Sequence, residues 1–353
     1  MISPPLITTI IPTYRRPKQL KRAIQSVLKQ TYPHFQICVY DNASGDETAQ
    51  VVAALAKQDS RVHYYCHQEN INSSPNFEYG MLQVKTPFFS FLSDDDILLP
   101  EFYQTALDGF EKYPEAAFSA GAVIDMAENG QFIAISKTTL QESELRIPPQ
   151  GLYDMIGSYI NWAGILFRRD VIDATGGIDK NVKPIDVDFV LKAAARFSYV
   201  VSQKPCAVFV HHDASYSGNC GLKLVWPSWF KIIENLKKVD NLNEKDKIKL
   251  EFLMKDKMRG LLTSIAVQEV LQKKIDEICS IADMMAGLPG GEIRGRILKK
   301  AAFFCKKSLL FQRAFWFFVK SSYKTFKYIK NYRALSRYKS YNRLLKENTC
   351  EKL

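Results

Sequence analysis

The strongest constraint on the fold is an alternation of short apolar runs with stretches of helical periodicity in the first third of the chain. Residues 6–12 (LITTIIP) form a β-rich run that ends at proline, and residues 17–30 place apolar side chains at helical spacing. The alternation continues with strands predicted at 35–41, 61–67 and 87–93 and helices predicted at 46–58, 76–84 and 101–112. This pattern is typical of a parallel sheet covered by helices on both faces, where ligands bind at the carboxyl ends of the strands.

The positive charge of the chain is concentrated at its C-terminal end. The 353 residues carry a net charge of +11, and residues 291–353 contain 17 Lys/Arg against 3 Asp/Glu, which leaves −3 for the rest. Seven cysteines without a CxxC pair argue against a disulfide framework or a zinc cage, and favour reduced thiols in a cytosolic setting. The sequence shows neither a signal peptide nor a membrane-spanning apolar run, so we expect a soluble or surface-attached chain.

The sequence pattern changes after Trp226, where strand signals give way to long helical stretches. A second, weaker break lies at Gly287–Gly291. The predicted organisation is therefore an α/β domain at 1–225, a helical extension at 226–290 and a basic, aromatic-rich helical tail at 291–353.

Three adjacent aspartates follow the strand predicted at 87–93. Asp94, Asp95 and Asp96 lie between the apolar sequences FFSFLS and ILLP. Adjacent carboxylates repel one another, so the cluster is either a solvated acidic loop or a site that binds a cation. Its position beside a core, at the end of a predicted central strand, favours a ligand site. Hard divalent cations such as Mg²⁺ take carboxylate ligands together with phosphate oxygens.

With two further motifs, this cluster resembles family 2 of the inverting glycosyltransferases, which have the GT-A fold. The resemblance covers residues 6–217, and its motifs are Pro12-Thr13-Tyr14-Arg15, the run YDNASGDET at 40–48, and Ser93 to Asp96. It implies an α/β fold with a mostly parallel sheet flanked by helices, here with an α-helical C-terminal extension. It also implies transfer of a sugar from a nucleotide-diphosphate sugar to a hydroxyl of a saccharide or lipid-linked acceptor, in surface polysaccharide synthesis.

The resemblance also implies roles for individual residues of the donor site. Asp41 is expected to contact the nucleotide base, Asp94 the ribose, and Asp95 or Asp96 a divalent metal, Mn²⁺ or Mg²⁺, on the diphosphate. The nucleotide-sugar-binding residues implied by the resemblance are Pro12, Tyr14, Arg15, Asp41, Asn76, Asp94 and Asp95. Asn76 lies in the segment INSSPNF, which lacks the glycine and arginine usual in the family.

An inverting transfer needs a base that deprotonates the acceptor hydroxyl as it attacks. The family supplies this base from a Glu-Asp pair at the start of a helix. Asp186 matches the aspartate, whereas Ile185 replaces the glutamate, and Asp188 is the second candidate. Positions i and i+2 do not share a helix face, so only one of the two aspartates is expected to face the site. The structural alternative is that both simply begin a helix after Pro184.

Three more residues complete the predicted site. His212 ends a predicted strand and is a candidate contact to the metal or the phosphates, although a solvated histidine is an equally simple interpretation. Trp162 and Gly164 are candidates for the acceptor pocket, because sugars stack on aromatic rings and glycine permits close approach. A core tryptophan is the alternative.

The tail interleaves aromatic residues with lysine and arginine, most densely at 301–339. Such a segment binds an anionic membrane surface, binds nucleic acid, or packs as a helical extension with a solvated basic face. We favour the membrane and no nucleic acid, because the resemblance implies lipid-linked acceptors at the inner membrane face. The predicted location is therefore cytoplasmic, peripheral at the inner face of the plasma membrane.

Two other functions are weaker alternatives. A nucleotidyltransferase of related fold needs a Gly-rich loop after the first strand to hold a triphosphate, and PTYRRPKQL contains no glycine. A catalytically silent nucleotide-sugar-binding protein is favoured only by Ile185.

Overall fold

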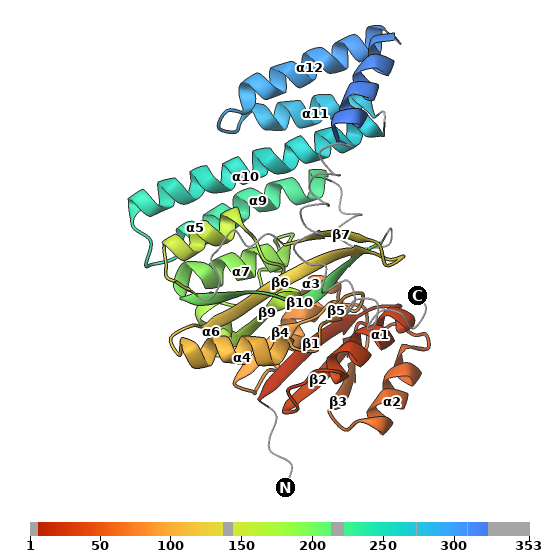
Figure 1. Ribbon diagram of the computed structural model, residues 1–353, viewed down its shortest axis with the longest axis vertical. Coiled ribbons are helices and arrows are strands. Elements are labelled where there is room, and N and C mark those ends of the chain that lie inside the picture. The colour runs from red at the N-terminus through yellow and green to blue at the C-terminus, as the bar shows by residue number, and fades with distance from the viewer. Residues whose placement is uncertain (1–5, 137–143, 213–221, 273, 309, 324–353) are drawn as a thin grey trace. The chain divides into compact units, whose positions relative to one another are not determined.

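The computed structural model describes residues 6–136, 144–212, 222–272, 274–308 and 310–323 (Figure 1). The chain forms two compact units, unit 1 at residues 1–242 and unit 2 at residues 243–352.

Unit 1 contains one ten-stranded sheet and the helices that cover it. The strands are β1 (Ile7–Thr13), β2 (Phe35–Asp41), β3 (Val62–Cys66), β4 (Phe88–Phe91), β5 (Ile97–Leu98), β6 (Phe118–Ala127), β7 (Phe132–Ile135), β8 (Leu145–Arg146), β9 (Ile165–Arg168) and β10 (Tyr199–His211). The helices are α1 (Pro17–Leu28), α2 (Thr48–Gln58), α3 (Ser73–Leu82), α4 (Phe102–Lys112), α5 (Gln150–Gly157), η1 (Trp162–Gly164), α6 (Asp170–Thr175), α7 (Ile185–Arg196) and α9 (Leu222–Lys237).

The strands follow the order β3-β2-β1-β4-β9-β6-β10-β5. β1 pairs in parallel with β2 and β4, and β2 pairs in parallel with β3, so these four strands end at one edge of the sheet. β6 and β10 form the other long parallel ladder. The predicted α/β fold with a mostly parallel sheet is confirmed. Between the two parallel groups, β9 runs antiparallel to both β4 and β6, which the strand–helix alternation did not indicate.

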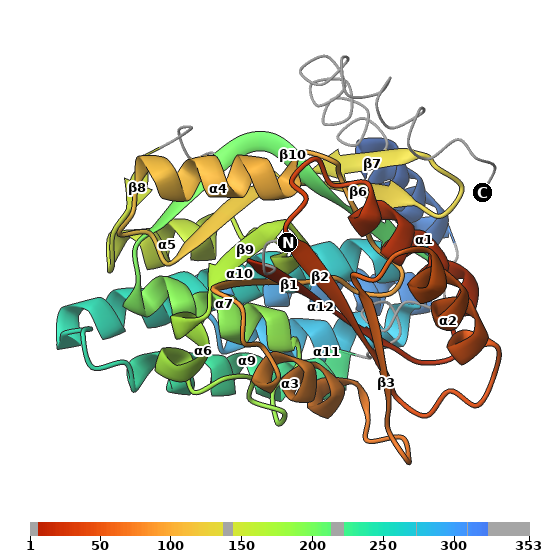
Figure 2. The same cartoon turned by 90° about the horizontal axis from the view of Figure 1, so that it is seen from below.

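Alternate residues of β4 explain how helices cover both faces of the sheet, because successive side chains of a strand point to opposite sides. The Phe88 ring stacks on Phe110 of α4, with ring centroids 4.9 Å apart. The neighbouring Phe89 packs instead against Phe189 of α7, with centroids 6.4 Å apart. Figure 2 shows α4 on one side of the strands and α3, α6 and α7 on the other.

Unit 1 extends past the boundary predicted near 225, which falls inside α9. Two polar contacts tie this segment to α7: the Asn235 amide donates to Asp188, and the Asn241 amide donates to the Ala195 carbonyl. Residues beyond 226 therefore complete the α/β unit before the helical unit begins at Asn243.

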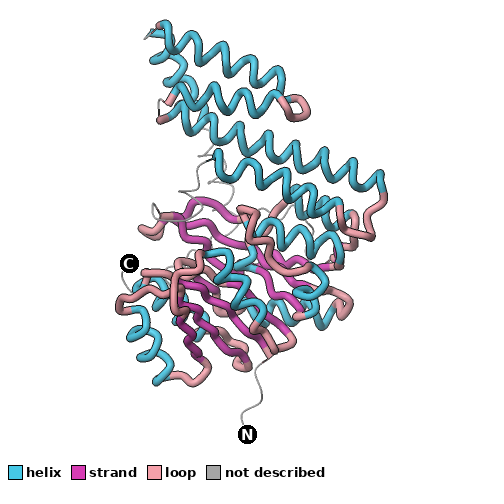
Figure 3. The backbone as a smooth tube through the Cα atoms, turned by 180° about the vertical axis from the view of Figure 1, so that it is seen from behind, coloured by secondary structure: helices cyan, strands magenta, loops and turns pink. Residues whose placement is uncertain are grey.

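Unit 2 is helical over its described residues (Figure 3). It contains α10 (Glu244–Leu271), α11 (Ile275–Ala286), α12 (Gly291–Lys307) and a further helical segment at residues 310–323. The break predicted near 290 separates α11 from α12, but both belong to the same unit. None of the described helices is long and apolar enough to cross a membrane. The remainder of the predicted tail, 324–353, lies outside the described residues.

Candidate active site

The parallel strands bring the predicted donor-site residues to one edge of the sheet. Thr13 at the end of β1 is in register with Asp41 at the end of β2. Asp94, Asp95 and Asp96 follow β4, the other neighbour of β1. The Thr13 hydroxyl donates to Asp94 Oδ2 over 2.7 Å, which joins the first and third motifs directly.

Asp41 is a buried carboxylate whose two oxygens are held from different sides. The Ser44 amide and hydroxyl donate to Oδ1 over 3.0 and 2.5 Å, and the Tyr64 hydroxyl donates to Oδ2 over 2.6 Å. Burial, with the hydrogen bond to Asp41, raises the pKa of Tyr64, so its hydroxyl remains a donor. A carboxylate oxygen has two lone pairs, and the site therefore keeps acceptor capacity for a base N–H.

The first motif is fastened to the second through Ser44. The Arg15 amide donates to Ser44 Oγ over 2.8 Å, and Arg15 Nε donates to the Ser44 carbonyl over 3.1 Å. Arg15 has φ +55°, a left-handed conformation that is uncommon for a residue other than glycine. Tyr14 beside it is exposed, with Arg15 stacked over its ring, whereas Pro12 is buried in β1 opposite Tyr40. Tyr14 and Arg15 thus face outward at the same edge as Asp41.

Asn76 is not at that surface. Its amide is buried in α3, donates to the Tyr40 carbonyl over 2.8 Å and lies 2.9 Å from His67 Nε2. Both polar atoms of the side chain therefore have partners inside the protein, where they hold α3 against the end of β2.

Asp95 is the centre of the acidic cluster. Its Oδ2 lies 2.7 Å from Arg16 Nη1 and 2.8 Å from His212 Nε2, and the same Arg16 nitrogen reaches Asp94 Oδ1 over 3.2 Å. The Arg22 guanidinium donates to the Asp95 carbonyl over 2.7 Å. The positive side chains explain how adjacent carboxylates are accommodated. Sequence reasoning did not single out Arg16, which directly precedes α1, or Arg22, which lies on α1.

Asp96 points elsewhere. Its Oδ1 accepts from the Val210 amide of β10 over 3.0 Å, and only 1% of the residue is exposed. Burial, reinforced by the Asp95 charge, raises the pKa of Asp96 well above its ordinary value, and the same two causes raise that of Asp94 to about 6. The three aspartates are therefore not equivalent, because one of them is used to join β10 to the loop after β4.

The carboxylate and imidazole that converge are those of Asp95 and His212. Within the described residues no three Asp, Glu, His or Cys side chains come together as a ready-made metal site. An oxygen and a nitrogen ligand nevertheless fit a divalent cation that receives its remaining ligands from a diphosphate. Of the predicted ligands, Asp95 and His212 suit this role, whereas Asp96 is turned toward β10.

Asp186 and Asp188 have different surroundings although both lie in the first turn of α7. Asp186 is partly exposed and accepts from the Tyr159 hydroxyl over 2.7 Å; burial raises its pKa, and the Tyr159 bond opposes this. Asp188 is fully buried, 3.0 Å from Lys192 Nζ and 3.0 Å from the Asn235 amide. Asp186 is therefore the more accessible of the two aspartates.

Trp162 and Gly164 form η1, next to β4 and β6. Trp162 is only 5% exposed, and its ring stacks on Phe91 with centroids 4.3 Å apart. A Cβ on Gly164 would lie 2.6 Å from the Val123 side chain and 2.9 Å from the Gly121 carbonyl. Glycine is needed here for close packing on β6, and the core position of Trp162 accounts for its aromatic ring. Their predicted role in the acceptor site stays a prediction.

Comparison with known proteins agrees with the resemblance. Residues 8–175 match the family described as "Glycosyl transferase family 2". A *Campylobacter jejuni* GalNAc(5)-diNAcBac-PP-undecaprenol beta-1,3-glucosyltransferase is 38% identical over 97 residues, 27% of this chain and 31% of that protein. A putative teichuronic acid biosynthesis glycosyltransferase of *Bacillus subtilis* is 26% identical over 126 residues, 36% of this chain and 50% of that protein. This chain thus spans half or less of the length of these two relatives.

Solved structures extend the similarity beyond the matched segment at the level of fold. *S. aureus* TarS, solved with UDP-GlcNAc, has a TM-score of 0.64 at 16% identity, covering 90% of this chain and 91% of that one. A *Pyrobaculum calidifontis* mannosyltransferase, solved with GDP-Man and Mn²⁺, has a TM-score of 0.53 at 14% identity, covering 94% of this chain and 88% of that one. Residues 8–175 of this chain therefore form a family 2 glycosyltransferase domain with the GT-A fold.

Proposed function

We propose that the protein is an inverting glycosyltransferase that moves a sugar from a nucleotide-diphosphate sugar to a hydroxyl of a saccharide or lipid-linked acceptor in surface polysaccharide synthesis. The observation that carries this proposal is the meeting of Asp41, Asp94, Asp95 and His212 around the ends of β1, β2, β4 and β10. A sugar nucleotide requires a buried carboxylate that binds the nucleotide base, a second carboxylate that binds the ribose, and a carboxylate–imidazole pair that binds a metal.

In this proposal Asp41 accepts from the nucleotide base, and Ser44 and Tyr64 hold its carboxylate in place. Asp94, fixed by Thr13, accepts from the ribose hydroxyls. Tyr14 and Arg15 line the same edge, and the Arg15 guanidinium contributes positive charge there. Asn76 supports the end of β2 from beneath rather than contacting the nucleotide itself.

We assign the divalent metal, Mn²⁺ or Mg²⁺, to Asp95 and His212. When bound, such an ion neutralises the charge that develops on the diphosphate leaving group. Arg16 already shares the Asp95 carboxylate with His212, so this arginine competes for the same oxygen.

We assign the base to Asp186. It lies at the start of α7, with one oxygen fixed by Tyr159, and it takes the proton from the acceptor hydroxyl as that hydroxyl attacks the sugar. The raised pKa of this carboxylate makes its ionised form a stronger base than an ordinary aspartate. Asp188 acts instead through its buried contacts, which hold α7 to α9.

The acceptor proposal includes a lipid-linked saccharide, because the *Campylobacter* relative is named for an undecaprenol-linked glycan. Such an acceptor places the enzyme at the inner face of the plasma membrane as a peripheral protein, attached through its basic C-terminal region.

Donor binding is the first test. Melting temperatures are measured with UDP, GDP, dTDP or CMP, each with and without Mn²⁺, and we expect one nucleotide to stabilise the protein further when Mn²⁺ is present. Asp95→Asn or His212→Gln should remove the Mn²⁺-dependent part of that stabilisation, whereas Asp96→Asn, at a carboxylate turned to β10, should retain it. If no nucleotide stabilises the protein, the donor site is wrongly assigned.

The base is tested separately. Asp186→Asn should leave nucleotide stabilisation unchanged and lower transfer about 100- to 10,000-fold, the usual contribution of a general base. Transfer at the parent rate by this variant would contradict the assignment without affecting the donor site.

A further inference from the structure

The helices at the end of the described chain have apolar residues on two opposite faces. On α12 the packed face includes Gly295, Ala302 and Cys305, which are buried. A Cβ on Gly295 would lie 2.7 Å from the Ala282 carbonyl of α11, so the two helices are in close contact there. This face accounts for one apolar stripe of α12.

A second stripe on α12 points away from that contact. Ile293, Ile297 and Phe304 recur at the i, i+4, i+11 spacing of a single helical face, about half a turn from Gly295 and Ala302. They are 67%, 60% and 50% exposed. An apolar stripe that faces solvent across several helical turns is not explained by the packing of unit 2.

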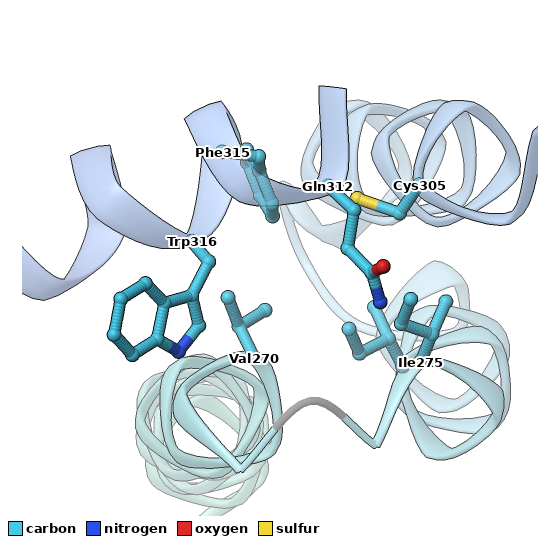
Figure 4. A pocket seen from close by; sticks show the side chains of 7 residues that line it. Val270, Ile275, Cys305, Gln312, Phe315 and Trp316 are labelled. Atoms are coloured by element: carbon cyan, nitrogen blue, oxygen red, sulfur yellow. The ribbon is translucent and has the colours of Figure 1, made fainter. Parts of the chain in front are cut away.

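The helical residues 310–323 repeat this arrangement. Their inward face is seen in Figure 4, where Gln312, Phe315 and Trp316 point toward Val270 and Ile275 around a small apolar pocket. The Trp316 indole donates to the Leu271 carbonyl over 3.0 Å, which fixes that face against the end of α10.

The opposite face of residues 310–323 is again apolar and exposed. Leu310, Phe317 and Phe318 are 80%, 69% and 67% exposed. The two stripes are linked across the turn, because the rings of Phe304 and Phe311 lie 5.5 Å apart between centroids. The outward face of unit 2 is defined here as Ile293, Ile297, Phe304, Leu310, Phe317 and Phe318.

Positive charge surrounds this outward face. Residues 291–323 contain eight Lys/Arg and one Asp/Glu. Lys299 and Lys306 pair with Asp283 and Asp276 of α11, on the packed side. Lys300 and Lys307 flank the outward stripe of α12 instead, with Lys307 Nζ 4.5 Å from the Phe303 ring centroid.

An exposed apolar face with lysines beside it favours one class of partner, a membrane surface. An outward face made of Phe, Ile and Leu with lysines at its margins is the pattern of a helix that lies in a membrane interface, with apolar side chains among the acyl chains and cations at the lipid phosphates. A second copy of the chain would bring two basic faces together, so the charge disfavours self-association. Nucleic acid would leave the aliphatic side chains without a partner.

We infer that the outward face of unit 2 inserts into an anionic lipid bilayer. Attachment thus needs both apolar insertion and the flanking charge, and it needs no nucleotide, metal or acceptor. It deepens the peripheral attachment that the proposed function includes, and it is independent of the proposed transfer reaction, so attachment and transfer can each fail without the other.

Cosedimentation of the full chain with vesicles tests this inference. Binding should occur with phosphatidylcholine–phosphatidylglycerol vesicles, weaken in high salt and be much lower with phosphatidylcholine alone. Phe317→Ser and Phe318→Ser should each lower the partition coefficient about tenfold, because each removes a large apolar side chain from the buried surface. Lys300→Gln should lower it about fivefold, the loss expected for one cation at the surface.

A matched control is available on α10 of the same unit. Ile248 and Phe252 are 70% and 53% exposed but lie outside the outward face. Ile248→Ser and Phe252→Ser should therefore leave vesicle binding unchanged. Equal losses for the two pairs of variants would overturn the inference, because they would show nonspecific hydrophobic adsorption.

Insertion depth is measured without removing the apolar side chains. Phe317→Trp adds a fluorophore to the outward face, and Phe252→Trp adds one at the control position. Brominated acyl chains should quench the added fluorescence of the first variant and not that of the second. Absence of quenching in Phe317→Trp would show that the outward face does not enter the bilayer. A concentration-dependent dimer of the parent chain that Phe317→Ser converts to monomer would show instead that this face binds a second copy.

Discussion

At the scale of single residues, the arrangement of Tyr159 and Asp186 gives a prediction about pH. The Tyr159 hydroxyl stabilises the ionised carboxylate, which opposes the rise in pKa caused by burial. Tyr159→Phe removes this bond, so the pKa of Asp186 should rise and the acid limb of kcat/KM for transfer should move to higher pH. Activity at the high-pH plateau should change less than activity at low pH.

The matched control is Tyr64→Phe, which removes the hydroxyl that donates to Asp41 and leaves the contacts of Asp186 unchanged. It should weaken nucleotide binding and leave the acid limb in place. An unshifted limb in Tyr159→Phe, or equal shifts in both variants, would argue that Tyr159 has no influence on the base.

The positions of individual residues also show how much of the candidate site could be predicted from the sequence. The motifs at 12–15, 40–48 and 93–96 placed Asp41 and the aspartates at strand ends, which the parallel pairing of β1, β2 and β4 bears out. The unequal roles of Asp95 and Asp96 could not be predicted, because they depend on the backbone of β10 at Val210. Arg16 was likewise missed, since its contact to Asp95 follows from the start of α1 beside the sheet edge.

At the scale of elements, the fold could be predicted where local periodicity determines pairing and not where distant segments meet. The first four parallel strands were expected from their alternation with helices. The place of β9 between β4 and β6 was not expected, because local sequence does not determine the partners of a four-residue strand and its pairing is set by contacts far along the chain.

The join between α7 and α9 gives a prediction about stability. Asp188 and Lys192 form a buried ion pair on α7, and Asn235 of α9 donates to the same carboxylate. Lys192→Met leaves the Asp188 charge buried without its cation and should lower the free energy of unfolding by about 3–5 kcal/mol. The double variant with Asp188→Leu should recover most of this loss, as measured by urea unfolding. A double variant no more stable than Lys192→Met would show that the charge itself is not the cause.

Close packing of η1 on β6 gives a second prediction at this scale. Gly164→Ala places a methyl group against the Val123 side chain and the Gly121 carbonyl, so unfolding should become easier by about 1–3 kcal/mol. Gly157→Ala is the matched control, because its added Cβ would meet no atom within 4 Å other than those of its chain neighbours and the nearby backbone of its own helix. Equal melting temperatures for the two variants would contradict the packing described for Gly164.

At the scale of the whole molecule, the division at Leu242 and Asn243 separates a slightly acidic α/β unit from a basic helical one. Charge counted over the entire chain hides this division. The proposed donor site uses residues of unit 1 alone, and the proposed membrane face uses residues of unit 2 alone. The two proposals thus assign transfer to unit 1 and membrane attachment to unit 2. The sequence predicted a boundary near 225, whereas the two units divide between Leu242 and Asn243.

Separate cores predict two unfolding transitions in calorimetry of the full chain. A ligand that binds only the folded state stabilises the unit that holds its site, by about 2.7 kcal/mol at a concentration of 100 Kd. The stabilising nucleotide with Mn²⁺ should therefore raise one transition and leave the other in place. Gly164→Ala should lower the transition that responds to nucleotide. Gly295→Leu, which forces α11 and α12 apart, should lower only the other one. A single transition that moves with both variants and with nucleotide would show that the two units unfold as one.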